Sequence, residues 1–125
     1  MARILVVDDD DSIRDTIYEL LETDHFCHAA ETAERALQFL ATETYDVVLT
    51  DISMPGMSGL ELLGYIRQHQ PQTPVIIISG ITDQEHAQGM IRMGAFNYIL
   101  KPFKLETIEA TVTQAIEHRQ QLLKK

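Results

Sequence analysis

The sequence contains little cysteine, no tryptophan and few positively charged residues. Because Cys27 is the one cysteine, no disulfide can form within the chain, which is typical of a reducing compartment. Ten lysines and arginines stand against nineteen aspartates and glutamates, giving a formal net charge of −9. A surface this acidic repels nucleic-acid phosphates and anionic lipids, so we expect neither nucleic acid nor membrane to bind this chain directly.

Long hydrophobic runs are also absent, since none approaches the ~18 residues that a membrane helix needs. The apolar run Ile4–Val7 ends at four consecutive aspartates and is too short for the apolar region of a signal peptide. The 125 residues are 45% hydrophobic and 23% charged, as in an ordinary globular domain. We therefore expect one cytoplasmic domain over residues 1–125.

Short apolar runs alternate along the chain with stretches of helical periodicity. The runs are apolar on both faces and rich in valine and isoleucine, which is typical of strands buried in a parallel sheet. Five such strands, each followed by a helix, predict an α/β fold with right-handed crossovers and a doubly wound sheet. In the fourth helix, Met90 and Ile91 are expected on the apolar face. The predicted strands are Ile4–Val7, Phe26–Ala30, Val47–Thr50, Val75–Ser79 and Tyr98–Leu100.

Chemically active side chains lie at or directly after four of these strands. Asp8 and Asp9 follow the first, Asp51 the third and Lys101 the fifth, while Ser79 ends the fourth. Ligands of doubly wound sheets bind beyond the carboxyl ends of the strands, so we expect these residues to meet there. Three adjacent carboxylates repel one another and favour a hard divalent cation such as Mg²⁺. Asp51 is then a candidate nucleophile that forms an acyl phosphate.

Simpler explanations exist for some of these residues taken singly. Asp10 and Asp11 lie where the first helix begins and are expected to cap it. Ser79 alone is an ordinary strand-end hydroxyl, and Lys101 alone is a solvated loop charge. Their convergence with the aspartates at one edge of the sheet is what favours a site.

Four motifs in order carry a resemblance to a known family. They are Ile4-Leu5-Val6-Val7-Asp8-Asp9, Asp51-Ile52-Ser53-Met54-Pro55-Gly56-Met57-Ser58-Gly59, Ser79-Gly80 and Lys101-Pro102-Phe103. Their order and spacing resemble the receiver domain of two-component response regulators over essentially the whole chain. The resemblance implies the flavodoxin-like fold of the chemotaxis regulators, with strand order 2-1-3-4-5.

The resemblance also implies a phosphorylation-controlled signalling switch within a phosphorelay. The phosphoryl group would come from a phosphohistidine of a sensor histidine kinase or of a phosphotransfer protein. Such a domain is a phosphoacceptor that assists its own phosphorylation and slow dephosphorylation, and is not an enzyme in the usual sense. The implied residues are Asp51 as phosphoacceptor, Ser79 and Lys101 on the phosphoryl oxygens, Ser79 and Tyr98 as the switch pair, and Asp8, Asp9, Asp51 and the Ser53 backbone carbonyl around Mg²⁺ or, as a substitute, Mn²⁺.

Two alternatives compete with this interpretation. Asp8 and Asp10 loosely resemble the signature of the haloacid dehalogenase phosphohydrolases, because they lie two residues apart after an apolar strand. That family has an acidic pair after its lysine, whereas Lys101 is followed by Pro102-Phe103, and the chain has no length to spare for a cap domain. The second alternative is a pseudo-receiver that docks onto a partner without being phosphorylated. A docking module would not require the three aspartates, the serine and the lysine.

The last helix is expected to run through residues 118–125, which is longer than coverage of the sheet requires. Leu122 and Leu123 continue the apolar stripe of Ala115 and Ile116 and would be exposed in an isolated domain. Our hypothesis is that this tail begins a linker to an output domain, such as a transcriptional one, and supports a phosphorylation-dependent homodimer. A stand-alone switch that docks onto a separate target protein is the alternative.

Overall fold

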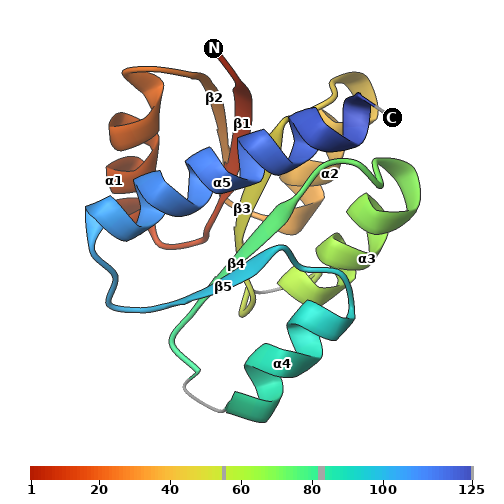
Figure 1. Ribbon diagram of the computed structural model, residues 1–125. Helices are drawn as coiled ribbons and strands as arrows, with labels where there is room; N and C mark the ends of the chain where they lie inside the picture. Colours follow the sequence, from red (N-terminus) through yellow and green to blue (C-terminus); the bar gives the residue numbers. More distant parts are fainter. Residues whose placement is uncertain (55, 82–83, 125) are drawn as a thin grey trace.

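The computed structural model describes residues 1–54, 56–81 and 84–124, so Pro55 of the second motif lies outside the described residues. Within these residues, five parallel strands form one sheet in the order β2-β1-β3-β4-β5, which confirms the predicted strand order (Figure 1). The strands are β1 (Arg3–Val7), β2 (Phe26–Ala30), β3 (Val47–Asp51), β4 (Val75–Ser79) and β5 (Asn97–Leu100). The helices are α1 (Asp11–Glu22), α2 (Ala33–Thr42), α3 (Gly59–His69), α4 (Gln84–Arg92) and α5 (Leu105–Leu123).

The strands agree with the predicted ones, and the differences lie at their ends. β3 extends one residue further than predicted because Asp51 still pairs with Ile78 of β4. β5 begins one residue earlier because Asn97 pairs with Ile76. The strands are therefore longer than their apolar runs, because polar residues at the ends also pair through their backbones.

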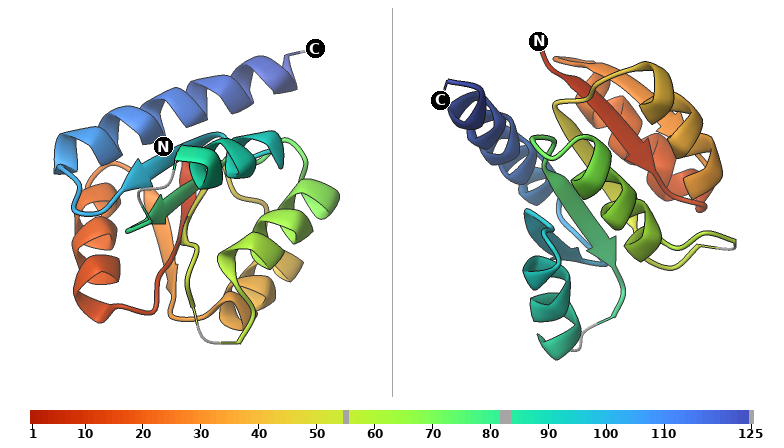
Figure 2. Two further views of the ribbon diagram at one scale, coloured as in Figure 1. Left: turned by 90° about the horizontal axis from the view of Figure 1, so that it is seen from below. Right: turned by 90° about the vertical axis from the view of Figure 1, so that its right-hand side faces the viewer.

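Two layers of helices cover the sheet, α1 and α5 on one face and α2, α3 and α4 on the other (Figure 2). All residues of β3 and β4 are buried, which explains why their sequences are almost continuously apolar. In α4, Met90 is buried as predicted, but Ile91 is 44% exposed, so its predicted burial was wrong. This short helix packs mainly against the edge strand β5, and its buried face is therefore narrow.

The start of α1 explains two of the four consecutive aspartates. Asp10 is the N-cap residue, and its side chain accepts a hydrogen bond from the Ile13 amide at 3.1 Å, as predicted. Asp11 lies in the first turn, where a negative charge is stabilised by the helix dipole. These two side chains therefore have local structural roles.

The end of α5 packs against its own chain more than predicted. Arg119 Nη1 donates to Asp46 Oδ1 at 2.8 Å, which ties the helix to the loop before β3. Leu122 is half-buried and lines a small pocket beside Phe96, whereas Leu123 is 50% exposed. The predicted exposure is thus correct for Leu123 alone, and residue 125 lies outside the described residues.

The structure also shows the surroundings of the cysteine and the character of the helices. Cys27 is buried, and burial raises the pKa of its thiol to about 11, so it is an unreactive core residue. Among the described residues, no helix combines the length and the apolar character that crossing a bilayer requires.

Candidate functional site

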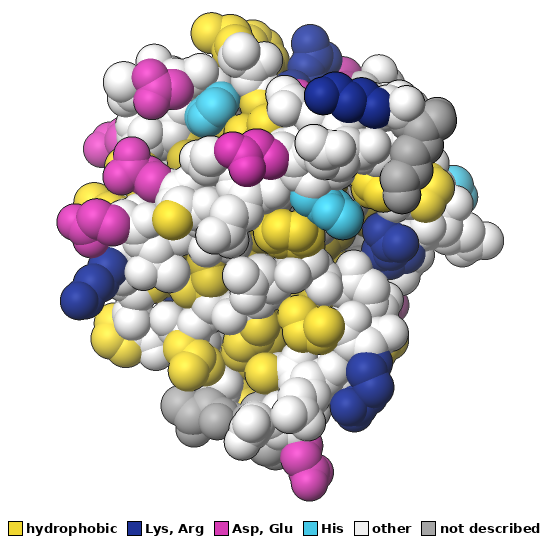
Figure 3. Space-filling model, viewed as in Figure 1, with side chains coloured by type: hydrophobic (Ala, Val, Ile, Leu, Met, Phe, Trp, Pro, Cys, Tyr) yellow, Lys and Arg dark blue, Asp and Glu magenta, His cyan; other side chains and the backbone are white. Residues whose placement is uncertain are grey.

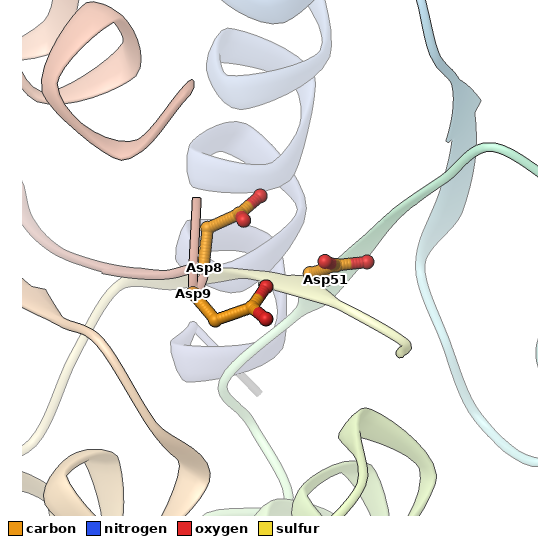
Figure 4. A group of neighbouring side chains, drawn as sticks. All are labelled: Asp8, Asp9 and Asp51. Carbon is orange, nitrogen blue, oxygen red and sulfur yellow. The ribbon is translucent and has the colours of Figure 1, made fainter. Parts of the chain in front are cut away.

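Three carboxylates lie together beyond the ends of β1 and β3 (Figure 4). One oxygen each from Asp8, Asp9 and Asp51 lies within 4.8 Å of the others. Asp8 and Asp51 are buried, whereas Asp9 is exposed at the rim. The adjacency of β1 and β3 in the sheet produces this cluster, because it brings residues far apart in sequence to the same edge.

Lys101 faces two of the three carboxylates from the end of β5. Its Nζ lies 3.4 Å from Asp8 Oδ2 and 3.3 Å from Asp51 Oδ2. Burial acts to lower the pKa of Lys101, but the charges of Asp8 and Asp51 outweigh burial, so the pKa is raised. The ammonium is therefore charged at neutral pH, and it offsets part of the negative charge of the cluster.

Asp8 carries a buried carboxylate whose charge its surroundings compensate only in part. Burial raises its pKa above the usual range, and the hydrogen bond that the Asp10 amide donates to Asp8 Oδ1 at 2.9 Å only partly opposes this. The charge of Asp51 raises the Asp8 pKa further, while Lys101 lowers it. Within the described residues, Asp8 Oδ2 is buried and accepts no hydrogen bond. A divalent cation beside this oxygen would add to the positive charge that Lys101 Nζ already supplies from 3.4 Å.

We expect Asp8→Asn to stabilise the metal-free protein at neutral pH and to weaken its response to Mg²⁺. Because the pKa of Asp8 is higher in the folded state, ionisation of Asp8 lowers the free energy of unfolding. This loss of stability is absent below the usual carboxyl pKa of about 4 and grows as pH rises through the folded-state pKa. The melting temperature should rise by roughly 3 °C without metal. With saturating Mg²⁺ the parent should have the higher melting temperature, because it binds the ion more tightly than Asp8→Asn does.

Thermal unfolding between pH 4 and pH 8, with chelator and with Mg²⁺, measures this effect. Asp10→Asn is the matched control, because asparagine also caps helices and the change removes the same charge nearby. A metal-free Asp8→Asn protein that is less stable than the parent at pH 7 would contradict the prediction.

Ser79 and Tyr98 are joined through the backbone of Ile81. The Ile81 amide donates to Ser79 Oγ at 3.0 Å, and the Tyr98 hydroxyl donates to the Ile81 carbonyl oxygen at 3.1 Å. A movement of the Ser79 hydroxyl away from the Ile81 amide would break the first of these two bonds. The two predicted switch residues therefore contact one shared segment.

The loop after Asp51 is held by close backbone packing. The Ser53 amide donates to Asp51 Oδ1 at 3.3 Å, and Ser53 itself is exposed. The Gly59 amide donates to the Ile52 carbonyl oxygen at 3.0 Å, where α3 begins. A Cβ atom on Gly59 would lie 2.2 Å from the Asp51 carbonyl oxygen, so glycine is required for this approach. The start of α3 thus packs directly against the backbone of Asp51 and Ile52.

Sequence reasoning missed one residue of the site, Arg14. Its guanidinium donates to the Asp8 carbonyl oxygen at 2.9 Å and pairs with Asp11 at 2.6 Å. The acidic–basic spacing of three residues on a predicted helix was a readable signal for the pair. The contact with the Asp8 backbone depends on how the loop folds, which no residue pattern reports.

Comparison with known proteins agrees with this geometry. The family model described as "Response regulator receiver domain" matches residues 4–113. The DNA-binding transcriptional regulator NtrC of Escherichia coli (strain K12) is 42% identical over 119 residues, covering 94% of this chain and 25% of the relative. The chain thus spans about a quarter of the length of the curated relatives it matches.

The chain is also similar in structure to solved response regulators. The response regulator receiver domain protein of Clostridium thermocellum superposes with a TM-score of 0.91 at 32% identity, covering 98% of this chain and 99% of that one. NtrX from Brucella abortus, solved in complex with ADP, gives a TM-score of 0.93 at 35% identity, covering 98% of this chain and 29% of that one. The chain therefore belongs to the response regulator receiver domain family, whose members are phosphorylation-controlled switches of two-component systems.

Proposed function

We propose that Asp51 is the residue that accepts the phosphoryl group in this chain, from a phosphohistidine of a partner kinase. A carboxylate oxygen of Asp51 attacks phosphorus, the new O–P bond forms as the N–P bond breaks, and the released imidazole nitrogen takes up a proton. The position of Asp51 carries this proposal. Asp51 lies at the carboxyl end of the central strand β3, and Lys101 Nζ lies 3.3 Å from its carboxylate.

Receiver domains generally bind Mg²⁺ at an acidic pocket, and the residues present fit that ion. The donors are hard carboxylate oxygens, and one of them, Asp8 Oδ2, is buried without a hydrogen bond among the described residues. Asp8, Asp9, Asp51 and the Ser53 backbone carbonyl would hold Mg²⁺ or Mn²⁺. When bound, the ion neutralises charge that develops on the transferring phosphoryl group.

Lys101 and Ser79 are proposed to bind the phosphoryl oxygens. Lys101 already lies between the carboxylates of Asp8 and Asp51 as a charged ammonium, so it offers a fixed positive charge to a group bound on Asp51. Ser79 reaches that group by giving up the hydrogen bond from the Ile81 amide. In this proposal the chain assists its own phosphorylation and slow dephosphorylation and turns over no separate substrate.

The phosphohydrolase alternative is not favoured. The family model matches 4–113 as a receiver domain, and the dehalogenase-like pair fails because Asp10 caps α1. A pseudo-receiver is also a poorer explanation, since the three carboxylates and Lys101 are assembled within contact distance.

The proposed function is tested with the whole chain and a small acyl-phosphate donor. In the presence of Mg²⁺ we expect the intact mass to increase by one phosphoryl group, and a chelator should prevent the increase. Hydroxylamine should remove the group, because it cleaves acyl phosphates and leaves phosphoserine intact. A chain that is not modified, or one whose added group resists hydroxylamine, contradicts the assignment.

Membership of the family implies a histidine kinase partner and an output domain. We infer that the output is transcriptional, because this chain is 42% identical over 119 residues to part of a DNA-binding transcriptional regulator. A phosphotransfer protein as donor, or a separate target protein as receiver of the signal, remains compatible with the same site. We propose that the domain acts in the cytoplasm as one unit over residues 1–125, with the net charge of −9 keeping nucleic acid and membrane away from it.

Phosphorylation must change a surface to be transmitted, and the face of α4, β5 and α5 is suited to that role. Hydrophobic side chains gather there (Figure 3). Ile91, Leu100 and Leu105 are each more than 40% exposed, and a shallow groove between α4 and β5 is lined by Ala87, Ile91 and Tyr98, among other residues. Movement of Tyr98 would reshape this groove.

We expect the phosphorylated chain to form a homodimer through this face and the end of α5. Sedimentation of the chain with and without beryllofluoride, which imitates the phosphoryl group, measures the change. Ile91→Glu should weaken the dimer by more than about tenfold, since burying a charge in an apolar contact is costly. Deletion of residues 120–125 should have an effect of similar size, because it removes the exposed apolar side chain of Leu123 from the contact. Phe26→Glu is the matched control, because Phe26 is 48% exposed on the distant edge strand β2. Monomers in both states would refute the dimer and favour a separate target.

A further inference from the structure

The run Asp8–Asp11 offers four carboxylates in succession, yet only the first two face Asp51. Asp10 Oδ1 accepts the Ile13 amide at 3.1 Å as the cap of α1. Asp11 Oδ1 pairs with Arg14 Nη2 at 2.6 Å. Within the described residues, Asp9 has no hydrogen bond or ion pair, so its carboxylate is available at the cluster. Some feature of the fold must hold the run in this register.

Arg14 contacts the run at both ends. Its Nη1 donates to the carbonyl oxygen of Asp8 at 2.9 Å, while its Nη2 binds the Asp11 carboxylate. The Arg14 side chain is only 15% exposed, although the Asp11 side chain is 83% exposed. Because a guanidinium is planar with donors in fixed directions, two such contacts restrain the segment between them.

We infer that Arg14 is a positioning residue for the Mg²⁺ site, an inference that rests on the proposed function. It holds the loop between β1 and α1 so that Asp8 and Asp9 face Asp51, and it engages Asp11 so that this carboxylate does not compete for the ion. The guanidinium binds the main chain of Asp8 and leaves the Asp8 carboxylate to Lys101 and the ion.

Arg14 has a second, opposing effect on the ion. Its positive charge repels Mg²⁺, so removing the charge alone would strengthen metal binding. If Arg14 positions the ligands, substituting it should weaken Mg²⁺ binding, whereas if Arg14 only repels the ion, substituting it should strengthen Mg²⁺ binding. This difference makes the inference testable without measuring activity.

The experiment is a Mg²⁺ titration of the whole chain followed by the NMR shifts of its backbone amides. We expect Arg14→Ala to weaken Mg²⁺ binding about tenfold, as is common for residues that orient metal ligands. Arg14→Lys should restore little of this loss, because a single ammonium does not reproduce the planar pair of donors. Arg35→Ala is the matched control, an arginine near the start of another helix that contacts Gln38 and Phe39 instead, and it should leave the affinity unchanged.

Two further measurements complete the test. Asp11→Asn breaks the ion pair but retains the Asp8 contact, so we expect a loss of only about threefold. Amide hydrogen exchange at residues 9–11 of the metal-free protein should be faster in Arg14→Ala than in the parent. Because Arg14→Lys and Asp11→Asn change the fold less, they carry the test if the alanine variant does not fold.

Equal or tighter Mg²⁺ binding by Arg14→Ala would overturn the inference in favour of simple repulsion. Mg²⁺ affinity in Arg14→Lys equal to that of the parent would show that only the positive charge of Arg14 matters, and would overturn the inference. Amide hydrogen exchange at residues 9–11 that is the same in Arg14→Ala and the parent would also refute the inference. These outcomes are distinct from a failure of the proposed function. If the parent binds Mg²⁺ but takes no phosphoryl group, the phosphoacceptor assignment fails while the role of Arg14 stands.

Discussion

Asp51→Asn is expected to lose phosphorylation by small acyl phosphates, with a decrease in rate on the order of 100-fold or more. Asparagine has the shape of aspartate, but its amide lacks the anionic oxygen that attacks phosphorus. The fold should tolerate the change, because the substitution also removes one of the mutually repelling charges of the cluster. The rate of mass increase in the presence of Mg²⁺ is the measurement.

The control for this variant is Asp10→Asn, which removes one negative charge near the site and retains the cap of α1. We expect its phosphorylation rate to lie within about threefold of the parent, since the Asp10 carboxylate is exposed, caps α1 and is not part of the cluster. If Asp51→Asn takes up the phosphoryl group as fast as Asp10→Asn does, the acceptor is another residue.

The second large effect is expected at Gly59, where a single methyl group should both destabilise the protein and displace Asp51. In Gly59→Ala the added Cβ would lie 2.2 Å from the Asp51 carbonyl oxygen and 2.8 Å from Ile52 Cα. Both neighbours are main-chain atoms, so the start of α3 must move away from β3. We expect a loss of about 2–3 kcal/mol of unfolding free energy and weaker Mg²⁺ binding.

Gly64→Ala provides a control within the same helix. An added Cβ at Gly64 has nothing within 4 Å, and alanine favours the helix over glycine. This variant should gain about 0.5–1 kcal/mol and phosphorylate normally. Chemical denaturation of both variants measures the difference. Equal stability of the two would show that α3 can shift at no cost and that Gly59 does not set the position of Asp51.

The fold was predictable from the sequence because each strand is a short run that is apolar on both faces. β2 and β4 have the predicted limits, and the ends of the others differ where polar residues such as Asp51 and Asn97 pair through their backbones. Ile91 could not be placed correctly, because helical spacing does not tell how much of a helix the edge of a sheet covers. These misses arise from tertiary packing, which local periodicity does not contain.

The members of the site were predictable because parallel strands deliver their following residues to one edge. Asp8, Asp51 and Lys101 therefore converge as expected, while the roles proposed for them await the experiments above. The contacts that hold them were not predictable. Arg14 reaches a backbone carbonyl, and Gly59 meets a main-chain atom, so neither contact follows from a residue pattern.

The order of the strands has a consequence for protein synthesis. Asp51 emerges from the ribosome 43 residues after Asp8, and Lys101 comes 50 residues later still, after an edge strand that pairs, within the described residues, only with β4. The strand pairings that bring these residues together join segments far apart in the sequence, and such non-local contacts make folding slow. A nascent chain that ends before Lys101 has the proposed acceptor, Asp51, but lacks the ammonium that lies 3.3 Å from it in the folded protein. Under the proposed assignment, such a translation intermediate cannot yet receive the signal.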